Sequence, residues 1–367
     1  MGEDGLVYQI GLTLIPGVGD VLGKKIVSLC GSAEAVFRES RQHLKKMPRI
    51  GELLAKAVGN KEILLRAEKE VAFVDRYHID SLYFQDTGYP HRLKNCFDSP
   101  ILLFYKGTAD LNSLHVIGIV GTRSATDYGK FVTHQIVSGL VHQKVLVVSG
   151  LAYGIDSCAH RSALDFGLNT VGSLGHGLDM VYPWLHRSLA EKMVVQGGLI
   201  TEFLSGTKPD RTNFPKRNRI IAGLCDAIVV VEAGRKGGAL ITADIANSYN
   251  RDVFAIPGRV NDPYSDGTNY LIRTNRASLI QKADDIEYLM GWKETTVQSQ
   301  PVQRKIFIEM TPEEEKIVAE LQEKGKLGID EICILIKNPA SKVSASLLNL
   351  EFEGVIQCLP GKVYELI

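Results

Sequence analysis

The stretch HVIGIVGT (residues 115–122) decides the fold of this sequence. It is an apolar run rich in β-branched residues, and the helical pattern DYGKFVTHQIVSGLVHQ (127–143) follows it. Near-continuous apolar strands that alternate with helices indicate a parallel sheet covered on both faces, so we expect an α/β fold with an extended Rossmann-like core. The same order recurs in VLVVSG (145–150), NTVGSL (169–174), GLITEF (198–203), DAIVVVEA (226–233) and DVFAIPG (252–258).

The pattern changes on both sides of this region. Before it, helical periodicity surrounds two short glycine hairpins, LIPGVGDVLGKKIV (14–27) and KKMPRIGELLAKAV (45–58). After a polar stretch without period come three short helical patterns and two β-prone runs around Pro360 and Gly361, which together predict a winged helix. The predicted domains are a helical module (1–75), a Rossmann-like domain (76–292), a linker (293–304) and a winged helix (305–367).

Composition excludes several classes of protein. The 367 residues carry 42 Lys plus Arg against 42 Asp plus Glu. No apolar run reaches the roughly 18 residues of a membrane span, and the N-terminus lacks the pattern of a signal peptide, so we expect a cytoplasmic protein without a membrane partner. Six cysteines without CxxC spacing are expected to be free thiols, and we predict no metal and no cofactor.

Two motifs place a cation between a strand and a helix. GTRSATDYG (121–129) puts Arg123 there, and EAGRKGGALITADIA (232–246) puts Lys236 before Gly237 and Gly238. Ligands of an open parallel sheet bind where the carboxyl ends of the strands meet the following helices, and helix N-termini attract phosphates. These residues are therefore expected to bind a phosphate. The alternative for Arg123 is a structural cap on a neighbouring carbonyl.

A basic stretch, TKPDRTNFPKRNR (207–219), has five cations and one acid. Arg211 and Phe214 are predicted to lie just before a helix, with Arg217 and Asn218 in its first turn. An aromatic ring beside arginines at a helix N-terminus is the combination that binds single-stranded nucleic acid, because bases stack on rings while cations meet phosphates. The alternative is a solvated basic face.

Two glycine-rich segments lie at further strand ends, SGLAYGIDSCAHRSAL (149–164) and SLGHGLDMVYPWLHRSLA (173–190). Asp156 and His160 share one helical face, but a metal site needs more ligands, so a structural hydrogen bond at the start of the helix is the favoured interpretation. His176 has no hydroxyl or thiol partner for nucleophilic catalysis. We find no Walker loop, GxSxG, HExxH or pair of catalytic carboxylates, so we predict no catalytic residue.

Taken in the order in which they occur along the chain, these five motifs resemble the bacterial DNA-processing protein A family (DprA, also called Smf). The resemblance covers residues 80–290. It implies a single-stranded DNA-binding protein without enzymatic activity, which forms a homodimer. Its implied role is to help load RecA recombinase during natural transformation, that is, in competence. Family members often have Ser-Gly at 237–238 and cysteine at 176. The resemblance assigns DNA binding to Arg123, Arg211, Phe214, Arg217, Asn218, Lys236, Gly237 and Gly238, with Gly150 and His176 as further contacts.

The flanking domains add two hypotheses. The PGVG hairpin resembles helix-hairpin-helix modules, so Gly17, Gly19 and Lys24 are expected as additional DNA contacts, against the alternative of a structural or dimerising role. Arg49 weakens the pattern in the second hairpin. Residues 305–367 carry 7 Lys plus Arg and 11 Asp plus Glu, a net charge of −4. Because this charge opposes binding to a polyanion, we expect the winged helix to contact protein or to regulate the dimer.

Two rival functions remain open. Phosphoribohydrolase-like enzymes that process nucleotides use the same sheet architecture, with a glutamate after a glycine-rich loop. In this chain the loop has no carboxylate until Asp244, which argues against hydrolysis. The other rival is a passive scaffold for recombination proteins, which predicts normal partner binding after the arginines are removed.

Overall fold

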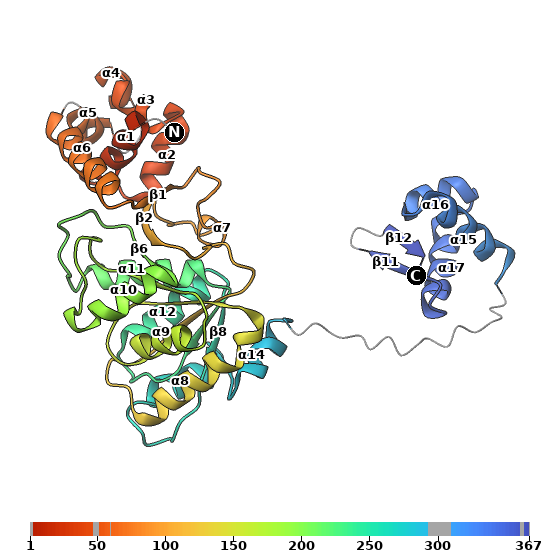
Figure 1. The fold of residues 1–367 in the computed structure, drawn as a ribbon. Helices are drawn as coiled ribbons and strands as arrows, with labels where there is room; N and C mark the ends of the chain where they lie inside the picture. Colours follow the sequence, from red (N-terminus) through yellow and green to blue (C-terminus); the bar gives the residue numbers. More distant parts are fainter. Residues whose placement is uncertain (1–2, 47–50, 59, 293–309, 360–362, 367) are drawn as a thin grey trace. The chain divides into compact units, whose positions relative to one another are not determined.

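The computed structural model describes residues 3–46, 51–58, 60–292, 310–359 and 363–366. Contacts divide the chain into two compact units, Met1–Trp292 and Lys293–Ile367 (Figure 1). The helical module and the sheet thus belong to one unit, and the predicted division between them at residue 75 stays a prediction. The predicted linker lies outside the described residues.

The first unit is built on a mixed sheet with the strand order β1-β2-β6-β5-β4-β3-β7-β8-β9. From β6 to β9 every neighbouring pair is parallel, which confirms the predicted Rossmann-like core. The strands are β1 (Asp80–Tyr83), β2 (Leu102–Gly107), β3 (Val116–Val120), β4 (Leu146–Ser149), β5 (Thr170–Ser173), β6 (Gly197–Thr201), β7 (Ala227–Val230), β8 (Asp252–Ala255) and β9 (Ser278–Leu279).

Helices cover both faces of this sheet, as the alternation of side chains in β3 requires. Val116 and Val120 pack in one core with residues of α11 and α12, whereas Ile117 and Ile119 pack in another with residues of α8 and α9. The helices of the sheet region are α7 (His91–Lys94), α8 (Asp127–Gly139), η1 (Val141–Gln143), α9 (Ile155–Asp165), η2 (Trp184–His186), α10 (Arg187–Val195), α11 (Asn213–Leu224), α12 (Gly238–Ser248), α13 (Asp266–Arg273) and α14 (Ala283–Leu289).

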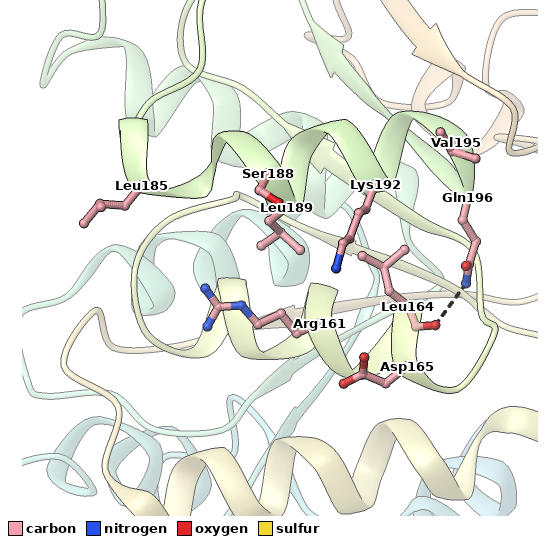
Figure 2. Close-up of a pocket in the computed structure, with 9 residues that line it drawn as sticks. All are labelled: Arg161, Leu164, Asp165, Leu185, Ser188, Leu189, Lys192, Val195 and Gln196. Carbon is pink, nitrogen blue, oxygen red and sulfur yellow. Dashed lines mark hydrogen bonds between the residues drawn. The ribbon is translucent and has the colours of Figure 1, made fainter.

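Helices α9 and α10 lie side by side on their face of the sheet (Figure 2). The amide of Gln196, just after α10, donates to the carbonyl of Leu164 in α9 at 3.4 Å. Between the two helices, Leu189 and Met193 are buried with Leu151 and Leu174 from the ends of neighbouring strands. This packing fixes the position of α10 against the sheet, and with it the side chains that α10 exposes to solvent.

One edge of the sheet is antiparallel. Strand β1 pairs antiparallel with β2, and β2 pairs antiparallel with β6. This edge carries the helical module, because Tyr83, Ile101, Leu102 and Phe104 belong to the same hydrophobic core as the module's helices. The module consists of α1 (Glu3–Thr13), α2 (Asp20–Cys30), α3 (Ala33–Arg38), α4 (Arg41–Lys45), α5 (Gly51–Ala57) and α6 (Lys61–Arg76).

The first glycine hairpin of the module leads into α2. Gly17 has a φ of +79°, a conformation that side-chain-bearing residues seldom adopt, and Gly19 is the N-cap of α2. Residues 47–50 of the second hairpin, and with them Arg49, lie outside the described residues.

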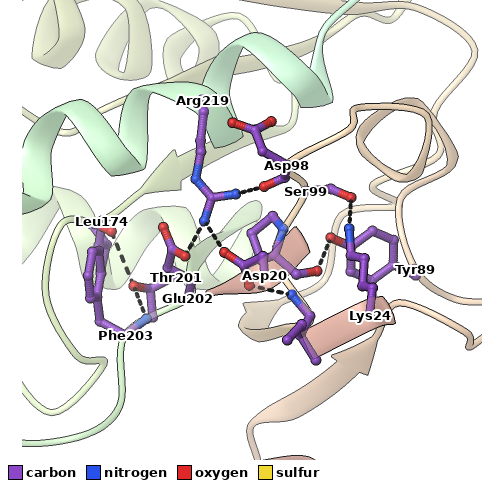
Figure 3. A network of polar contacts seen from close by, with 12 residues as sticks. Asp20, Lys24, Tyr89, Asp98, Ser99, Leu174, Thr201, Glu202, Phe203 and Arg219 are labelled. Carbon is purple, nitrogen blue, oxygen red and sulfur yellow. Dashed lines mark hydrogen bonds and ion pairs between the residues drawn. The ribbon is translucent and has the colours of Figure 1, made fainter. Parts of the chain in front are cut away.

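A polar network ties α11 to the helical module (Figure 3). Arg219 pairs with Asp20 of α2 at 2.9 Å and with Glu202, and it also donates to the carbonyl of Asp98. Burial raises the pKa of Glu202 to about 7, opposed by Arg219 and reinforced by Asp20. Lys24 joins the network by donating to the hydroxyl of Ser99.

Lys24 was predicted as a DNA contact, but its ammonium group donates to a hydroxyl inside the protein. Burial lowers the pKa of Lys24, with the charge of Asp20 opposing this effect. The side chain is half-buried, so it contributes less to an exposed basic surface than its sequence position beside the hairpin indicates.

The second unit is a winged helix, as predicted. Its helices are packed around one apolar core, and its small sheet has the order β10-β12-β11. The tip of the predicted hairpin, residues 360–362, lies outside the described residues. The elements are α15 (Pro312–Lys324), β10 (Leu327–Gly328), α16 (Ile329–Ile336), α17 (Ala340–Phe352), β11 (Ile356–Leu359) and β12 (Val363–Leu366).

Candidate nucleic-acid interface

The order in which strands are added to the sheet reverses between the parallel neighbours β3 and β7. Strands β4, β5 and β6 follow β3 on one side, and the chain then crosses to place β7 on the other side. Such a switch point opens a crevice at the carboxyl ends of the strands, because the loops after the two neighbours turn away from each other. A cavity of about 410 Å³ lies there, lined by the segments after β3 and β7 and by α11 and α12, and we call it the rim cavity.

Most of the predicted DNA-binding residues line this cavity together. They come from three separate sequence motifs, which only the sheet topology brings to one place. Those that line it are Arg123, Phe214, Arg217, Asn218, Lys236, Gly237 and Gly238.

Phe214 and Arg123 form one wall. The guanidinium carbon of exposed Arg123 lies 5.3 Å from the centroid of the half-buried Phe214 ring. Helix α11 begins at Asn213, so Phe214 lies in its first turn and not before the helix as predicted. The helix can begin before Pro215 because a residue in the first turn needs no backbone N–H, which proline lacks.

Arg217 lines the cavity and connects it to the ends of the neighbouring strands. Its side chain is only 5% exposed, and its guanidinium donates to the carbonyls of Gly150 and Ser173, which follow or end β4 and β5. A Cβ added at Gly150 would lie 2.1 Å from the Arg217 Nη1 atom, so a side chain there has no space. Arg217 thus ties together the ends of two strands, β4 and β5, and its Nη1 group is committed to this frame.

Asp156 is the counter-charge of Arg217 inside this frame. It lies at the start of α9, where its carboxylate accepts from the backbone N–H of Ala152 at 3.4 Å. Burial raises the pKa of Asp156, and the charge of Arg217 opposes that shift. Asp156 thus makes the kind of bond expected at the start of the helix, whereas His160 on the same helix pairs with the hydroxyl of Thr170 in β5 at 2.7 Å.

The start of α12 forms another part of the cavity lining. Its N-cap residue, Gly237, makes no side-chain capping bond, and the first N–H groups of a helix have no partner within the helix. The amide of Asn218 donates to the carbonyl of Gly238 at 3.3 Å, and exposed Lys236 precedes the turn. A helix N-terminus next to a lysine and an arginine is suited to an anionic group.

Two contributions to this cavity were not identified from the sequence. Glu232, only 1% exposed, accepts from the N–H of Thr126 at 3.0 Å and from its hydroxyl, which fixes the loop that carries Arg123. The signal in the sequence was its position, because Glu232 is a charged residue directly after the apolar run that contains β7. Tyr264 lines the cavity and is 38% exposed. An aromatic residue within the turn-forming run NDPYSDG was its signal.

Other predicted contacts lie elsewhere. Arg211 is exposed but does not line the rim cavity, and neither do Gly17 and Gly19 of the helical module. His176 is 1% exposed; its Nδ1 is bonded to the carbonyl of Gly177 at 2.9 Å, and its Nε2 accepts from the N–H of Tyr182 at 3.3 Å. Both ring nitrogens therefore hold its own loop, and neither is free for a ligand.

Within the described ranges, no group of three or more His, Cys, Asp or Glu side chains is arranged to hold a metal ion. None of the helices in the same ranges combines the length and hydrophobicity that crossing a bilayer demands.

Comparisons with protein families place two regions of the chain. Residues 80–291 match the family model described as DNA recombination-mediator protein A. Residues 308–362 match the model of the DprA winged helix domain.

Individual relatives agree with these matches. Protein Smf of Synechocystis sp. is 32% identical over 402 residues, covering 100% of both chains. DNA processing protein DprA of Streptococcus pneumoniae is 40% identical over 201 residues, covering 55% of this chain and 71% of the relative.

Solved structures give the same result. DNA processing protein A from Streptococcus pneumoniae superposes with a TM-score of 0.63 at 31% identity, covering 77% of this chain and 97% of that one. DNA processing protein A from Helicobacter pylori, described for its unique single-stranded DNA binding mode, superposes with a TM-score of 0.53 at 26% identity, covering 58% and 96%.

Proposed function

The chain belongs to the DNA recombination-mediator protein A family, and on that premise we propose that it binds single-stranded DNA in the rim cavity. The observation that carries the proposal is the convergence of Arg123, Phe214 and Lys236 from separate motifs on one cavity at the switch point of the sheet. A ring for base stacking, two exposed cations and a helix N-terminus are the parts of a single-strand site.

The roles of the cavity residues follow from their exposure. Phe214 stacks against a base, while Arg123 and Lys236 neutralise phosphates beside it. The N–H groups of Gly237 and Gly238, at the start of α12, donate hydrogen bonds to a further phosphate oxygen. Arg217 and Gly150 act by positioning, because both are committed to the frame beneath the ring. The single-strand binding of the Helicobacter pylori relative supports this assignment.

We further propose that the protein acts as a binder and not as a nucleotide-processing enzyme. The carboxylate that lines the cavity, Asp156, is buried beside the charge of Arg217 and is part of the frame. Asp244, the first acid after the glycine loop, pairs with Arg276 at 2.6 Å and does not line the cavity. Neither carboxylate has the position of a general base facing a bound nucleotide.

The biological role that we propose is protection of incoming DNA and loading of RecA recombinase during natural transformation, by a cytoplasmic homodimer. The description of the family as a recombination mediator supports this role. The winged helix is proposed as a protein-contacting or dimer-regulating domain because its region carries a net charge of −4. The isolated winged helix is expected to bind DNA far more weakly than the full chain.

Fluorescence anisotropy of a labelled oligothymidine, titrated at several salt concentrations, tests the central proposal. We expect a slope of log affinity against log salt of about −0.7 for each neutralised phosphate. Arg123→Ala/Lys236→Ala is expected to weaken binding and to reduce the slope by about 1.4. The matched control is Lys282→Ala/Lys316→Ala, which removes two exposed lysines that do not line the cavity.

If the double variant and its control lost the same amount of single-strand affinity, the rim cavity would not be the DNA-binding site. Duplex competitor should displace the oligomer poorly, since stacking on Phe214 requires an unpaired base. Release of free base from AMP or CMP, in the same preparation, would replace the binding proposal with the phosphoribohydrolase alternative.

A further inference from the structure

We propose that single-stranded DNA leaves the rim cavity past Arg123 and continues over the outer surfaces of α8, α9 and α10. We call this surface the outer track, defined by Arg123, Phe131, Tyr153, Arg161, Leu185 and Lys192. The proposal rests on the proposed function and adds a second part to the same binding site. It assigns the track to the nucleotides that do not fit in the cavity.

The first support is continuity. A hollow of about 790 Å³ between α8 and α9 shares Arg123 with the rim cavity. A second hollow of about 580 Å³ between α9 and α10 shares Arg161 and Leu185 with the first. The surface therefore holds three depressions in succession, and the residue that joins the first two is a predicted phosphate-binding arginine.

The second support is the sign of the charge. Arg123, Lys130, Arg161 and Lys192 line the two hollows, against the single acid Asp165. Figure 2 shows Lys192 on α10 pointing toward α9, which carries Arg161.

Two of these cations are available for an external anion. Lys130 pairs with Asp127 at 3.0 Å, but among the described residues neither Arg161 nor Lys192 makes an ion pair or a side-chain hydrogen bond within this chain. In a chain with equal numbers of acids and bases, this surface is locally basic.

The third support is a set of exposed rings in or beside the two hollows. Phe131 is 59% exposed and Tyr153 43%, and both line the hollow between α8 and α9. Beside Leu185, which is 75% exposed, Trp184 is 68% exposed with the guanidinium carbon of Arg187 at 5.1 Å from its ring centroid. Rings at this exposure leave apolar area in water, and each offers a face on which a base can stack.

Single-stranded DNA fits this combination better than a protein partner does. A protein docking on the apolar side chains would have to neutralise Arg161 and Lys192 with acids at matching positions. A single strand supplies one phosphate per base as a property of its backbone, and the track continues the proposed DNA site without a break. Cations and exposed rings in the same groove are the combination that binds single strands independently of sequence.

The test compares oligothymidines of 6 and 20 nucleotides, the shorter to occupy the rim cavity and the longer to reach the track. We expect Arg161→Ala/Lys192→Ala to reduce the ratio of the long-oligomer to the short-oligomer affinity by about tenfold near 0.1 M salt. Its salt slope for the long oligomer should decrease by about 1.4. The control Lys282→Ala/Lys316→Ala should keep the wild-type ratio and slope.

A second readout uses Trp184 as a reporter in the Trp292→Phe background, since the chain has 2 tryptophans. The long oligomer is expected to quench Trp184 fluorescence by stacking, and the short oligomer to leave it unchanged. An unchanged affinity ratio, or no quenching by the long oligomer, overturns the outer track while short-oligomer binding still supports the rim cavity. Failure of both oligomers to bind the wild-type protein overturns both proposals. Normal DNA binding by the Arg161→Ala/Lys192→Ala variant, together with lost RecA loading, would assign this surface to a protein partner instead.

Discussion

Helix α11 carries two buried arginines, two residues apart, that do different work. Arg217 bonds to the carbonyls of Gly150 and Ser173 beneath the rim cavity. Arg219 pairs with Asp20 and Glu202 and fastens the helix to the helical module. Side chains at positions i and i+2 of a helix point to different sides, so one helix serves both the cavity and the interface between the module and the sheet.

The difference teaches that a cluster of basic residues in the sequence is not one functional unit. Of the five cations in residues 207–219, Arg217 and Arg219 are buried, while Lys208, Arg211 and Lys216 are exposed. Both buried arginines act as structural elements, because Nη1 of Arg217 and the two terminal nitrogens of Arg219 donate to groups inside the protein. The predictions below measure stability or DNA binding, or both, for three of these cations and for Glu202, the ion-pair partner of Arg219.

Replacement of Arg219 is expected to have the largest effect on stability. Arg219→Met leaves Asp20 and Glu202 partly buried without their partner, and the loss of one member of a buried ion pair costs about 3–5 kcal/mol. Urea denaturation measures this loss. DNA affinity of the folded fraction should equal that of wild type.

The companion variant Asp20→Asn/Glu202→Gln/Arg219→Met removes the stranded charges and should recover part of the stability. A loss below about 1 kcal/mol for Arg219→Met would show that the network is exposed to solvent and contributes little.

Replacement of Arg217 should lower stability and DNA affinity together. Arg217→Met removes the donors of two buried carbonyls, which costs about 1–3 kcal/mol for each group left unsatisfied. The support below Phe214 is lost with them, so single-strand affinity should fall in the same variant. Arg217→Lys, which keeps one donor group, should show intermediate losses in both measurements; a loss of affinity at full stability would make Arg217 a direct DNA contact.

The pH dependence of stability should report Glu202. Its pKa is raised from 4.5 to about 7 in the folded protein. Between these values the unfolded chain releases a proton that the folded protein retains, so the free energy of unfolding should fall with rising pH by about 1–3 kcal/mol. Glu202→Gln should flatten this part of the profile, and an unchanged slope in that variant would contradict the assignment.

The exposed Arg211 should give the smallest effect. It was predicted as a DNA contact, yet it does not line the rim cavity. Arg211→Ala is expected to change single-strand affinity by less than about twofold and the free energy of unfolding by less than about 0.5 kcal/mol. A large loss of affinity would extend the binding site to the loop before α11.

The parallel core was predictable because most of its strands are near-continuous apolar runs, followed by a glycine or turn residue and then by a helical pattern. The antiparallel direction of β2 was not, since the sequence LLFYKG has the same apolar character in either direction. What orients β2 is its pairing with β6, nearly 100 residues away in the chain, together with the module packed on the same edge. Strand direction depends on such nonlocal contacts, which local patterns do not contain.

The candidate site was predictable to the level of residue clusters. Strand-end loops with Arg123 and Lys236 converge because parallel strands end at one edge. The buried roles of Arg217 and His176 were not predictable, because which side chain of a helix or loop turns inward depends on the packing of β4, β5 and α11. Glu232 was missed for the same reason: its partner Thr126 is 106 residues away in sequence.

The most direct measurement is photo-cross-linking of a 6-nucleotide oligothymidine that carries one 5-iodouracil, followed by mapping of the modified residue by mass spectrometry. The account predicts cross-links at Phe214, since iodouracil reacts with the ring on which it stacks, and their loss in Phe214→Leu. Cross-links confined to the helical module or the winged helix, and unchanged in Phe214→Leu, would contradict the rim cavity as the single-strand site.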